Sequence, residues 1–351
     1  MLNSNATINF KLALPLNFDD DRDLLFLNQH SDYSFKNLSL NFFKNIRVSN
    51  NCVAYNYFNI IKESCATEEI FNNYNQSWKF YFKYCFPQFN FTNKKIILFT
   101  NEYFTNYFHW HEMLQKIILL QQQNLLSDSL ILLPKKYRNY SFIVESLKIL
   151  GIKDQQILTI NKKSNLKVKE LIFPCATGIN PDLINQLREG LTLGVKANLN
   201  TNLLTAKSQF QERIYISRQG QKLRSIENEV EVVDLLEQFG FKKIIMENYS
   251  YHQQIEICMN ARFIIGPHGA GLTNILFMKK NGYLLELSAK NNEDFFQGFY
   301  VLANMLGQNY LYQKCQIAKN SIATDSHHSN LFVDLERLKR NIQIMLNHAN
   351  I

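Results

Sequence analysis

The segment Arg262-Phe-Ile-Ile-Gly-Pro-His-Gly-Ala-Gly-Leu-Thr-Asn274 decides the fold of this chain. Its residues 263–265 form a short apolar run with β propensity, which predicts a buried strand; glycines and a second apolar stretch that can begin a helix follow. Such a turn brings bare backbone N–H groups to an anion, because no Cβ blocks the approach and the positive helix end favours negative charge. The segment predicts a phosphate site, although a tight strand-to-helix connection without a ligand has the same pattern.

Size and composition predict a globular protein of two ordinary domains. The chain has 351 residues, of which 46% are hydrophobic and 19% charged, so each domain can bury its own core. The net charge of +8 indicates an anionic partner, but the lysines and arginines are spread along the chain. A phosphorylated substrate and an anionic membrane surface fit this charge equally well. Nucleic acid is not favoured, because no recognised binding module appears.

Cysteine spacing and the N-terminal sequence bear on compartment and metal content. The six cysteines lie far apart without a C-x-x-C pair, so neither a zinc site nor a disulfide framework is predicted. The first residues lack a basic segment followed by an apolar core, and no apolar run reaches the roughly 18 residues of a membrane-spanning helix. We therefore expect a soluble protein of the cytoplasm. The triplet Asp19-Asp20-Asp21 is interpreted as an exposed turn.

Strand and helix patterns alternate from about residue 94 onward, which predicts an α/β fold with parallel sheets covered by helices. In the first half we expect strands at 95–99, 130–133, 156–160 and 171–173, and helices at 105–123, capped by Thr105, and at 140–150. Two prolines and a glycine within 174–181 predict a domain boundary. A helix at 182–198 and a polar linker at 200–211 follow.

The second half repeats the pattern and predicts a doubly wound sheet. Strands are expected at 214–217, 243–246, 263–265, 283–287 and 309–312, and helices at 225–239, after Ser250, at 294–306 and at 331–348. Ser225 is expected to cap the first of these helices, with Gly240 as its end. Its apolar face is predicted to be Ile226, Val230, Val233, Leu236 and Phe239. Ser250 and Gln253 form a capping box for the next helix, which carries Tyr251, Ile255 and Cys258 on one face.

Three polar residues come at or near the carboxyl ends of predicted strands in the second half. They are Arg218, His268 and Glu286. Ligands of open parallel sheets collect at these ends, where arginine and imidazole can hold a diphosphate and a carboxylate can accept hydrogen bonds from ribose hydroxyls. Each of them alone has an ordinary interpretation as a surface residue, a capping group or a strand-edge charge, and only their convergence at one edge indicates a nucleotide.

The informative segment of the first half is Asn106-Tyr-Phe-His-Trp-His-Glu112. On a helix, His109 and Glu112 are three residues apart and can touch, and Lys116 shares their side. Such a pair could take a proton from a hydroxyl, but a solvated helix face is an equally ordinary interpretation. His111 lies nearer the apolar stripe and is expected to be partly buried. A metal pair of His109 and His111 is a weaker option, because residues two apart on a helix diverge by about 200°.

Taken together, these motifs resemble glycosyltransferase family 61 in order and spacing. The matching residues are Asn106-Tyr-Phe-His-Trp110, Ile214-Tyr-Ile-Ser-Arg218, Arg224-Ser-Ile-Glu-Asn-Glu229, Gly240-Phe241, Gln254, Ala261, Ile264 to Asn274, Phe277 and Leu285-Glu-Leu287. The resemblance covers about residues 100–345. There is one departure: the family's acidic residue three positions after the tryptophan is replaced by Met113, and Glu112 comes one position earlier.

The resemblance implies a GT-B architecture of two Rossmann-like domains facing a cleft. We expect an acceptor domain at 1–175, a nucleotide-sugar domain at 176–330 and a C-terminal helix at 331–351 that packs back across them. The residues expected to face the donor are Arg218, Arg224, Asn228, Glu229, His268, Gly269, Ala270, Gly271, Asn274 and Glu286, although Asn228 and Glu229 have an equally good structural interpretation. His109 and Glu112 are the expected catalytic residues.

The resemblance also implies an inverting hexosyl- or pentosyltransferase that uses UDP- or another NDP-sugar and a glycan or lipid-linked acceptor. We expect it to build a bacterial capsule or lipopolysaccharide at the inner face of the membrane. No D-x-D motif is visible at the end of a predicted strand, so no metal or other cofactor is expected and arginines would stabilise the diphosphate. The alternatives are a non-catalytic nucleotide-binding or scaffold protein that keeps the fold, or a metal-dependent hydrolase using His109 and His111.

Overall fold

The structure, a computed structural model, divides into two compact units. It describes residues 7–18, 31–57, 59–75, 77–84, 89–162, 164–201, 212–289, 298–319, 321, 323 and 328–351. The N-terminal unit comprises Met1–Ile8 and Phe35–Leu191, and the C-terminal unit comprises Asn9–Ser34 and Thr192–Ile351. The division falls inside helix α6 (Pro181–Thr201), whereas we placed the domain boundary after residue 175. The predicted turn at Asp19-Asp20-Asp21 lies outside the described residues.

The N-terminal unit is built mainly on one mixed sheet. Its order is β4-β3-β2-β8-β5-β6-β7, with β1 paired to β2. Strands β8, β5, β6 and β7 run parallel, as the alternation of strands and helices predicts, whereas β2 runs antiparallel to β8. The strands are β1 (Thr7–Lys11), β2 (Asp32–Val48), β3 (Ala54–Asn56), β4 (Asn59–Ile60), β5 (Phe89–Ile97), β6 (Ser129–Pro134), β7 (Ile157–Ile160) and β8 (Asn165–Thr177).

The helices of this unit are α2 (Glu68–Asn75), α3 (Trp78–Tyr84), α4 (Tyr107–Gln122) and α5 (Ser141–Ile149), followed by α6. The helices α4, α5 and α6 lie close to the predicted positions, whereas no helix was predicted where α2 and α3 lie. The predicted cap of α4 at Thr105 is wrong by one residue. The side chain of Asn106 accepts hydrogen bonds from the N–H groups of Phe108 and His109 and thereby satisfies two donors at the helix start.

The C-terminal unit has the doubly wound topology that the sequence predicts. Its sheet order is β10-β9-β11-β12-β13-β14, so the five parallel strands follow the order 2-1-3-4-5 along the chain. These strands are β9 (Arg213–Ile216), β10 (Lys242–Ile244), β11 (Phe263–Pro267), β12 (Tyr283–Ala289) and β13 (Asn309–Ile317), with β14 (Leu331–Phe332) antiparallel at the edge.

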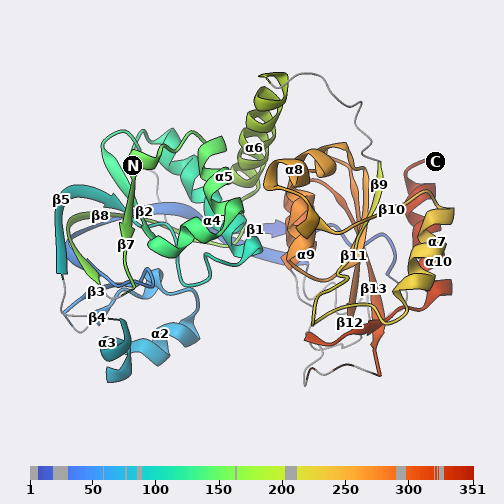
Figure 1. The fold of residues 1–351 in the computed structure, drawn as a ribbon, viewed down its shortest axis with the longest axis horizontal. Helices are drawn as coiled ribbons and strands as arrows, with labels where there is room; N and C mark the ends of the chain where they lie inside the picture. The colour runs from blue at the N-terminus through green and yellow to red at the C-terminus, as the bar shows by residue number, and fades with distance from the viewer. Residues whose placement is uncertain are drawn as a thin grey trace. The chain divides into compact units, whose positions relative to one another are not determined.

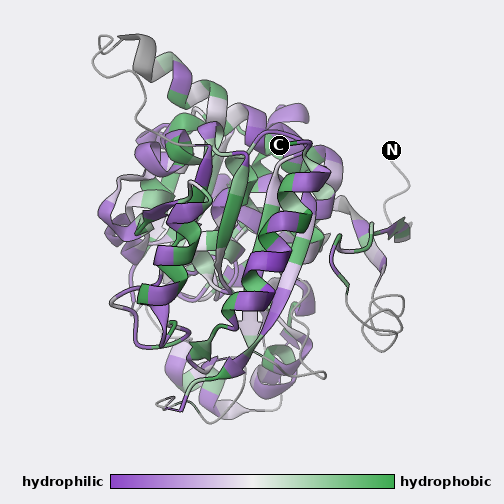
Figure 2. Cartoon of the chain, turned by 90° about the vertical axis from the view of Figure 1, so that its right-hand side faces the viewer, coloured by the Kyte–Doolittle hydropathy of each residue, from purple (hydrophilic) through white to green (hydrophobic). Residues whose placement is uncertain are grey.

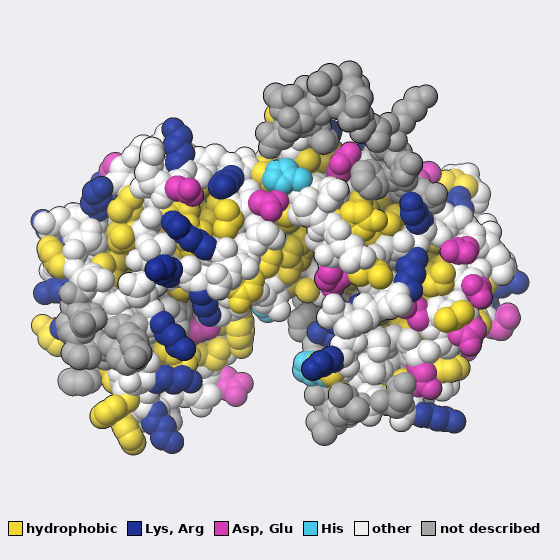
Figure 3. Space-filling model, viewed as in Figure 1, with side chains coloured by type: hydrophobic (Ala, Val, Ile, Leu, Met, Phe, Trp, Pro, Cys, Tyr) yellow, Lys and Arg dark blue, Asp and Glu magenta, His cyan; other side chains and the backbone are white. Residues whose placement is uncertain are grey.

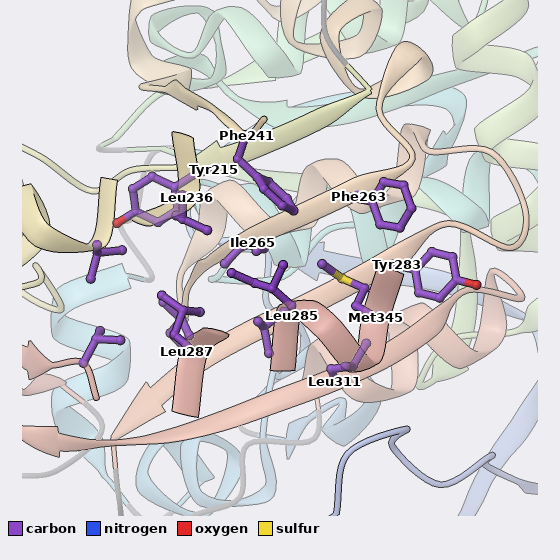
Figure 4. Packing of buried hydrophobic residues seen from close by; sticks show 14 of the residues in the cluster. Tyr215, Leu236, Phe241, Phe263, Ile265, Tyr283, Leu285, Leu287, Leu311 and Met345 are labelled. Atoms are coloured by element: carbon purple, nitrogen blue, oxygen red, sulfur yellow. The ribbon is translucent and has the colours of Figure 1, made fainter. Parts of the chain in front are cut away.

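Helices cover both faces of this sheet. Figure 1 shows α7 (Glu229–Gln238) and α10 (Leu335–His348) along one face and α8 (Tyr251–Asn260) and α9 (Gly298–Met305) along the other. In Figure 4 the side chains of Tyr215, Ile265 and Leu285 on the strands meet Leu236 of α7 and Met345 of α10. Figure 2 shows the matching pattern, in which apolar strands lie behind helices that alternate between hydrophobic and hydrophilic residues. Helix α10 therefore contributes to the core of its own unit.

The helices predicted at 225–239 and 331–348 begin later, at Glu229 and Leu335, because short extended segments precede them. The N–H of Leu331 donates to the carbonyl of Ser225 at 2.8 Å, and Ile226 pairs with Leu331 in a parallel bridge. Ser225 therefore caps no helix, and α7 begins at Glu229 with Val230 73% exposed. The capping box of α8 is confirmed, and the predicted start of α9 at residue 294 lies outside the described residues.

Residues 12–17 form a strap on the C-terminal unit that the sequence did not reveal. The Leu16 N–H donates to the Tyr310 carbonyl at 3.0 Å, beside the ladder of β13. Asn17 is 3% exposed; its amide donates to the Tyr312 carbonyl and to Asn341 Oδ1, and its own oxygen accepts from the Tyr312 N–H. The strap covers a strand edge that would otherwise present unpaired backbone groups.

Candidate functional site

The carboxyl ends of β9 and β11 mark the point where the winding of the C-terminal sheet reverses. The chain continues from β9 to β10 on one side, while β11 pairs with β9 on the other. The register pairs Ile264 with Ile214, so both strands end at the same edge. The residues that follow them, Ser217-Arg218 and His268-Gly269, therefore come together where doubly wound sheets bind ligands.

Arg218 lies directly on the glycine turn. A Cβ atom placed on Gly269 would collide with Nη1 of Arg218 and would lie 3.0 Å from its Cζ. The guanidinium is held from behind, because its Nε and Nη2 donate to the Leu223 carbonyl at 3.3 and 3.2 Å. A glycine at position 269 is thus what allows the arginine to approach the turn.

The electrostatics at this turn are strongly positive. Burial and, to a lesser extent, the nearby charge of Arg224 together lower the pKa of Arg218 to about 10, and the charge of Glu247 opposes this shift. Arg224 occupies the left-handed region at φ 60°, a strained conformation for an arginine. Two partly buried guanidinium groups that repel each other are the natural partners of an anion with more than one negative charge.

The segment after Gly269, which we expected to begin a helix, is a 3₁₀ helix, Ala270–Phe277. Its first intrahelical bond runs from the Leu272 N–H to the Gly269 carbonyl at 2.9 Å. The N–H groups of Ala270 and Gly271 precede that bond, so the helix itself does not use them. Both residues are only partly buried, and their N–H groups suit a phosphate oxygen.

His268 and Glu286 form a buried pair beside the turn. The Nδ1 atom of His268 is hydrogen-bonded to Oε1 of Glu286, whose other oxygen accepts from the Tyr310 hydroxyl at 2.8 Å. Glu286 is 2% exposed and His268 is 8% exposed. The carboxylate of Glu286 therefore orients the imidazole of His268 and keeps a proton on its Nδ1. We had expected this carboxylate to accept hydrogen bonds from the ribose of the donor instead.

The other predicted donor residues lie within internal networks. The buried amide of Asn274 donates to the Gly271 carbonyl at 3.0 Å and to Gln254 at 3.3 Å, so it braces the 3₁₀ helix. Asn228 bonds both backbone groups of Val333, and Glu229 accepts hydrogen bonds from three side chains. Those side chains are Tyr215, Ser217 and Lys243. Of the alternatives we gave for Asn228 and Glu229, these contacts favour the structural one.

The glycines of the turn allow a matched test of this geometry. We expect Gly269→Ala to leave the unfolding free energy within about 1 kcal/mol of the native value, because the flexible end of Arg218 can move away, but to weaken UDP binding about tenfold or more. Gly266→Ala should instead destabilise by about 1–3 kcal/mol, because its Cβ would lie 3.0 Å from the backbone oxygen of Ile216. Urea unfolding and UDP titration separate the two effects; equal loss of stability in both variants would contradict the assignment.

In the N-terminal unit, α4 carries the predicted catalytic pair. The Nδ1 of His109 lies 3.2 Å from Oε2 of Glu112, and both side chains are about one-third exposed, at 35% and 30%. Tyr103 stacks on the His109 ring at a centroid distance of 5.2 Å. Glu112 stands one position before the family's acidic residue, but it still contacts His109, because residues three apart on a helix are neighbours.

Lys116 shares the helix face of this pair and contacts the segment that follows β5, the strand beside β8, where the order of the parallel strands reverses. Gln115 joins α4 to the end of β8, with its amide donating to the Gly178 carbonyl at 3.0 Å. Lys116 donates to the Phe99 carbonyl at 3.2 Å and lies 5.9 Å from the Phe173 ring centroid. Burial lowers the pKa of Lys116, and the charge of Glu112 opposes this shift. The sequence placed Lys116 on this face, but its burial was not predictable from spacing.

His111 is structural, as the sequence indicated. It is 2% exposed, its Nδ1 donates to the Tyr107 carbonyl at 2.7 Å, and burial lowers its pKa to about 4. It is therefore neutral and turned inward, which leaves it unsuited to share a metal ion with His109. Within the described residues, no three His, Cys, Asp or Glu side chains are grouped to hold a metal.

Glu102, in the loop after β5, is a titratable group that sequence reasoning missed. Burial raises the pKa of this carboxyl to about 7, although the N–H groups of Glu102 and Ala66 favour the charged form. The Ala66 N–H donates to its Oε2 at 3.0 Å. No local pattern signals the burial, because it arises from segments that are distant in sequence.

We expect the charge of Glu102 to oppose folding at neutral and alkaline pH. A folded-state pKa raised from 4.5 to about 7 gives a stability contribution that is complete below pH 4.5 and is lost as the pH rises through 7. Glu102→Gln should remove this dependence and, relative to wild type, gain about 3 kcal/mol between pH 4.5 and 8. Urea unfolding across this range tests it, with exposed Glu63→Gln as control. Parallel pH profiles for wild type and Glu102→Gln would refute the prediction.

The fold and these residues define an α/β protein whose doubly wound unit carries a glycine turn and a partly buried arginine at its switch point. The sequence model of the family Glycosyltransferase 61 matches residues 107–285, half of the chain. The chain therefore belongs to glycosyltransferase family 61, which confirms the resemblance seen in its motifs, and it is a glycosyltransferase that needs a sugar donor and a glycan acceptor. The match spans both His109 and the complete glycine turn. No curated protein matches the chain.

Proposed function

We propose that this glycosyltransferase is an inverting hexosyl- or pentosyltransferase that uses a nucleotide-sugar, UDP-linked or of another NDP type. The proposal rests on the close approach of the Arg218 guanidinium to Gly269 at the switch point of the sheet. A nucleoside diphosphate is both the leaving group of such a donor and the ligand suited to this turn. Metal independence belongs to the same proposal, because fixed guanidinium groups and N–H groups can stabilise the charge that develops on the diphosphate.

In this proposal the turn stabilises the leaving group. The N–H groups of Ala270 and Gly271 and the guanidinium of Arg218 bind phosphate oxygens, and Arg224 adds positive charge. His268, oriented by the carboxylate behind it, presents its imidazole at the same edge. Glu286, Asn274, Asn228 and Glu229 then act by positioning, since their contacts lie inside the protein.

The proposed chemistry is a single displacement at the anomeric carbon. His109 takes the proton of the acceptor hydroxyl while Glu112 holds the imidazole and stabilises its positive charge. The acceptor oxygen forms a bond to C1 of the sugar, the bond from C1 to the phosphate oxygen breaks, and its electron pair leaves with the diphosphate. Attack opposite to the leaving group inverts the configuration at C1.

The biological setting is part of the proposal as well. We infer a glycan or lipid-linked acceptor in bacterial capsule or lipopolysaccharide synthesis, with the enzyme acting in the cytoplasm against an anionic membrane. The net charge of +8 supports the membrane contact. A GT-B arrangement is supported by the parallel strands that each unit contains. Among the described residues, none of the helices is long and apolar enough to cross a bilayer.

The experiment that tests the proposal is a thermal-shift screen of UDP, other nucleoside diphosphates and their sugars, carried out in EDTA. A ligand that binds the folded state raises the melting temperature, so at least one of them should stabilise the protein without a metal ion. Transfer from the stabilising nucleotide-sugar to candidate acceptors is then followed by release of the nucleotide. If the nucleotides raise the melting temperature only after divalent cations are added, metal independence is refuted. If none of them raises it, the donor site is refuted.

A non-catalytic nucleotide-binding protein is the second candidate. Met113, which replaces the acidic residue expected at that position, is 4% exposed and takes no part in the polar face of α4. The contact between Glu112 and His109 restores a histidine–carboxylate pair and so favours the enzyme. If a nucleotide raises the melting temperature but no nucleotide-sugar is transferred or hydrolysed, the protein is non-catalytic.

A further inference from the structure

Helix α3 in the N-terminal unit presents two aromatic side chains to solvent. Trp78 is 67% exposed and Phe82 is 77% exposed. They lie one helical turn apart, and their rings contact edge to face at a centroid distance of 5.2 Å. Large apolar side chains that are exposed and ordered together mark an interaction surface more often than a folding role.

The opposite side of α3 holds the helix rigidly in place. Phe80 is 2% exposed and packs at 6.3 Å from the Tyr55 ring and at 4.6 Å from the Tyr74 ring. Tyr84 joins the same cluster at 5.5 Å from Phe80. Because these rings anchor one face, the Trp78–Phe82 pair projects from a fixed platform.

Basic residues accompany the pair. Lys79 and Lys83 directly follow Trp78 and Phe82, both are exposed, and α3 carries no acidic residue. Figure 3 shows hydrophobic side chains protruding where α3 lies, with Lys or Arg side chains beside them. Tryptophan and lysine on one short helix are the combination that proteins use at the boundary of an anionic bilayer, where the ring enters the headgroup layer and the ammonium meets the lipid phosphate.

We propose that α3 is the membrane-docking element of this protein, with Trp78 and Phe82 inserting into an anionic lipid surface and Lys79 and Lys83 binding its headgroups. The inference rests on the membrane contact in the proposed function and assigns that contact to one helix. Neither the donor turn nor the His109 face contributes residues to it. Loss of docking and loss of donor binding can therefore be measured separately.

The tryptophan content makes the test selective. The chain has two tryptophans, and the other one, Trp110, is fully buried with its indole N–H bonded to Ser146 Oγ at 2.9 Å. A blue shift of tryptophan emission on adding vesicles therefore reports Trp78. We expect this shift, together with co-sedimentation, for phosphatidylcholine vesicles that contain phosphatidylglycerol, and much weaker binding to vesicles of phosphatidylcholine alone.

Variants distinguish docking from general charge attraction. The double variant Trp78→Ala, Phe82→Ala and the double variant Lys79→Gln, Lys83→Gln should each lower vesicle affinity about tenfold or more. Phe42→Ala, which removes an aromatic ring that is 65% exposed on β2, should bind as wild type does. All variants should keep the thermal stabilisation by nucleotide, so that a failure of docking is distinct from a failure of the donor site.

Three results would overturn the assignment. Wild-type protein that remains in the supernatant with unchanged emission excludes docking. Unchanged affinity of both double variants places the membrane contact elsewhere. If the wild-type protein self-associates without vesicles and the double variant Trp78→Ala, Phe82→Ala does not, the surface binds a second copy of the chain and not a membrane.

Discussion

Replacing Arg218 by alanine is expected to lower kcat/KM for sugar transfer by about 10²–10³-fold. In the proposed mechanism negative charge develops on the departing diphosphate at the glycine turn, where the guanidinium lies. Removing one fixed donor to such a charge costs a factor of this size. The loss should appear in kcat as well as in UDP affinity. Steady-state kinetics and calorimetric titration of UDP measure the two quantities.

The control for this experiment is Arg340→Ala, which removes an exposed arginine from α10 of the same unit. It should leave both kcat/KM and UDP affinity unchanged, since an exposed charge distant from the turn is screened by solvent. Arg218→Lys should restore only part of the activity, because an ammonium cannot form the planar paired contacts of a guanidinium. Wild-type kinetics for Arg218→Ala would contradict the donor assignment.

Replacing His109 by alanine is expected to lower kcat by about 10²–10⁴-fold while UDP affinity stays within about twofold. A positioned base contributes a factor of this order, and the histidine belongs to a different unit from the glycine turn that is proposed to bind the diphosphate. Glu112→Gln should have a smaller effect in the same direction, because it keeps a hydrogen-bond partner for Nδ1 but removes the charge.

His252→Ala, on α8 of the C-terminal unit, is the matched histidine control and should turn over as the native enzyme does. Unfolding curves of all three variants establish that the fold is retained. If His109→Ala turned over at the native rate, another group would be the base. Glu102 would then be the first candidate, since it lies in the loop after β5 and its pKa is about 7.

Much of the C-terminal unit could be predicted from sequence because its signals are local. The apolar run at 263–265 is one of five short strands bounded by turns, and Ser250 with Gln253 is a self-contained capping box. Residues whose environment depends on distant contacts were harder to predict. Ile226 has the spacing of a helix face, yet it pairs with Leu331, and only the folded chain shows that partner.

The candidate site shows the same limit. The topology brings Arg218 and Gly269 together as the strand ends predicted, because both follow parallel neighbours of the sheet. Sequence cannot distinguish a polar side chain that faces the ligand from one that faces the protein. Glu286 and Asn274 stand at motif positions, but both are buried and hydrogen-bonded inside the unit. Their burial is a property of packing and not of spacing.

A fixed arginine and main-chain N–H groups are proposed to bind the diphosphate without a cation. The most direct measurement is a calorimetric titration of UDP into wild type and Gly269→Ala in EDTA, with the nucleoside diphosphate that gave the largest thermal shift used if it is not UDP. We expect wild type to bind, and Gly269→Ala to bind at least tenfold more weakly at similar stability. Binding that needs added Mg²⁺, or that is equal in both proteins, would contradict the proposal.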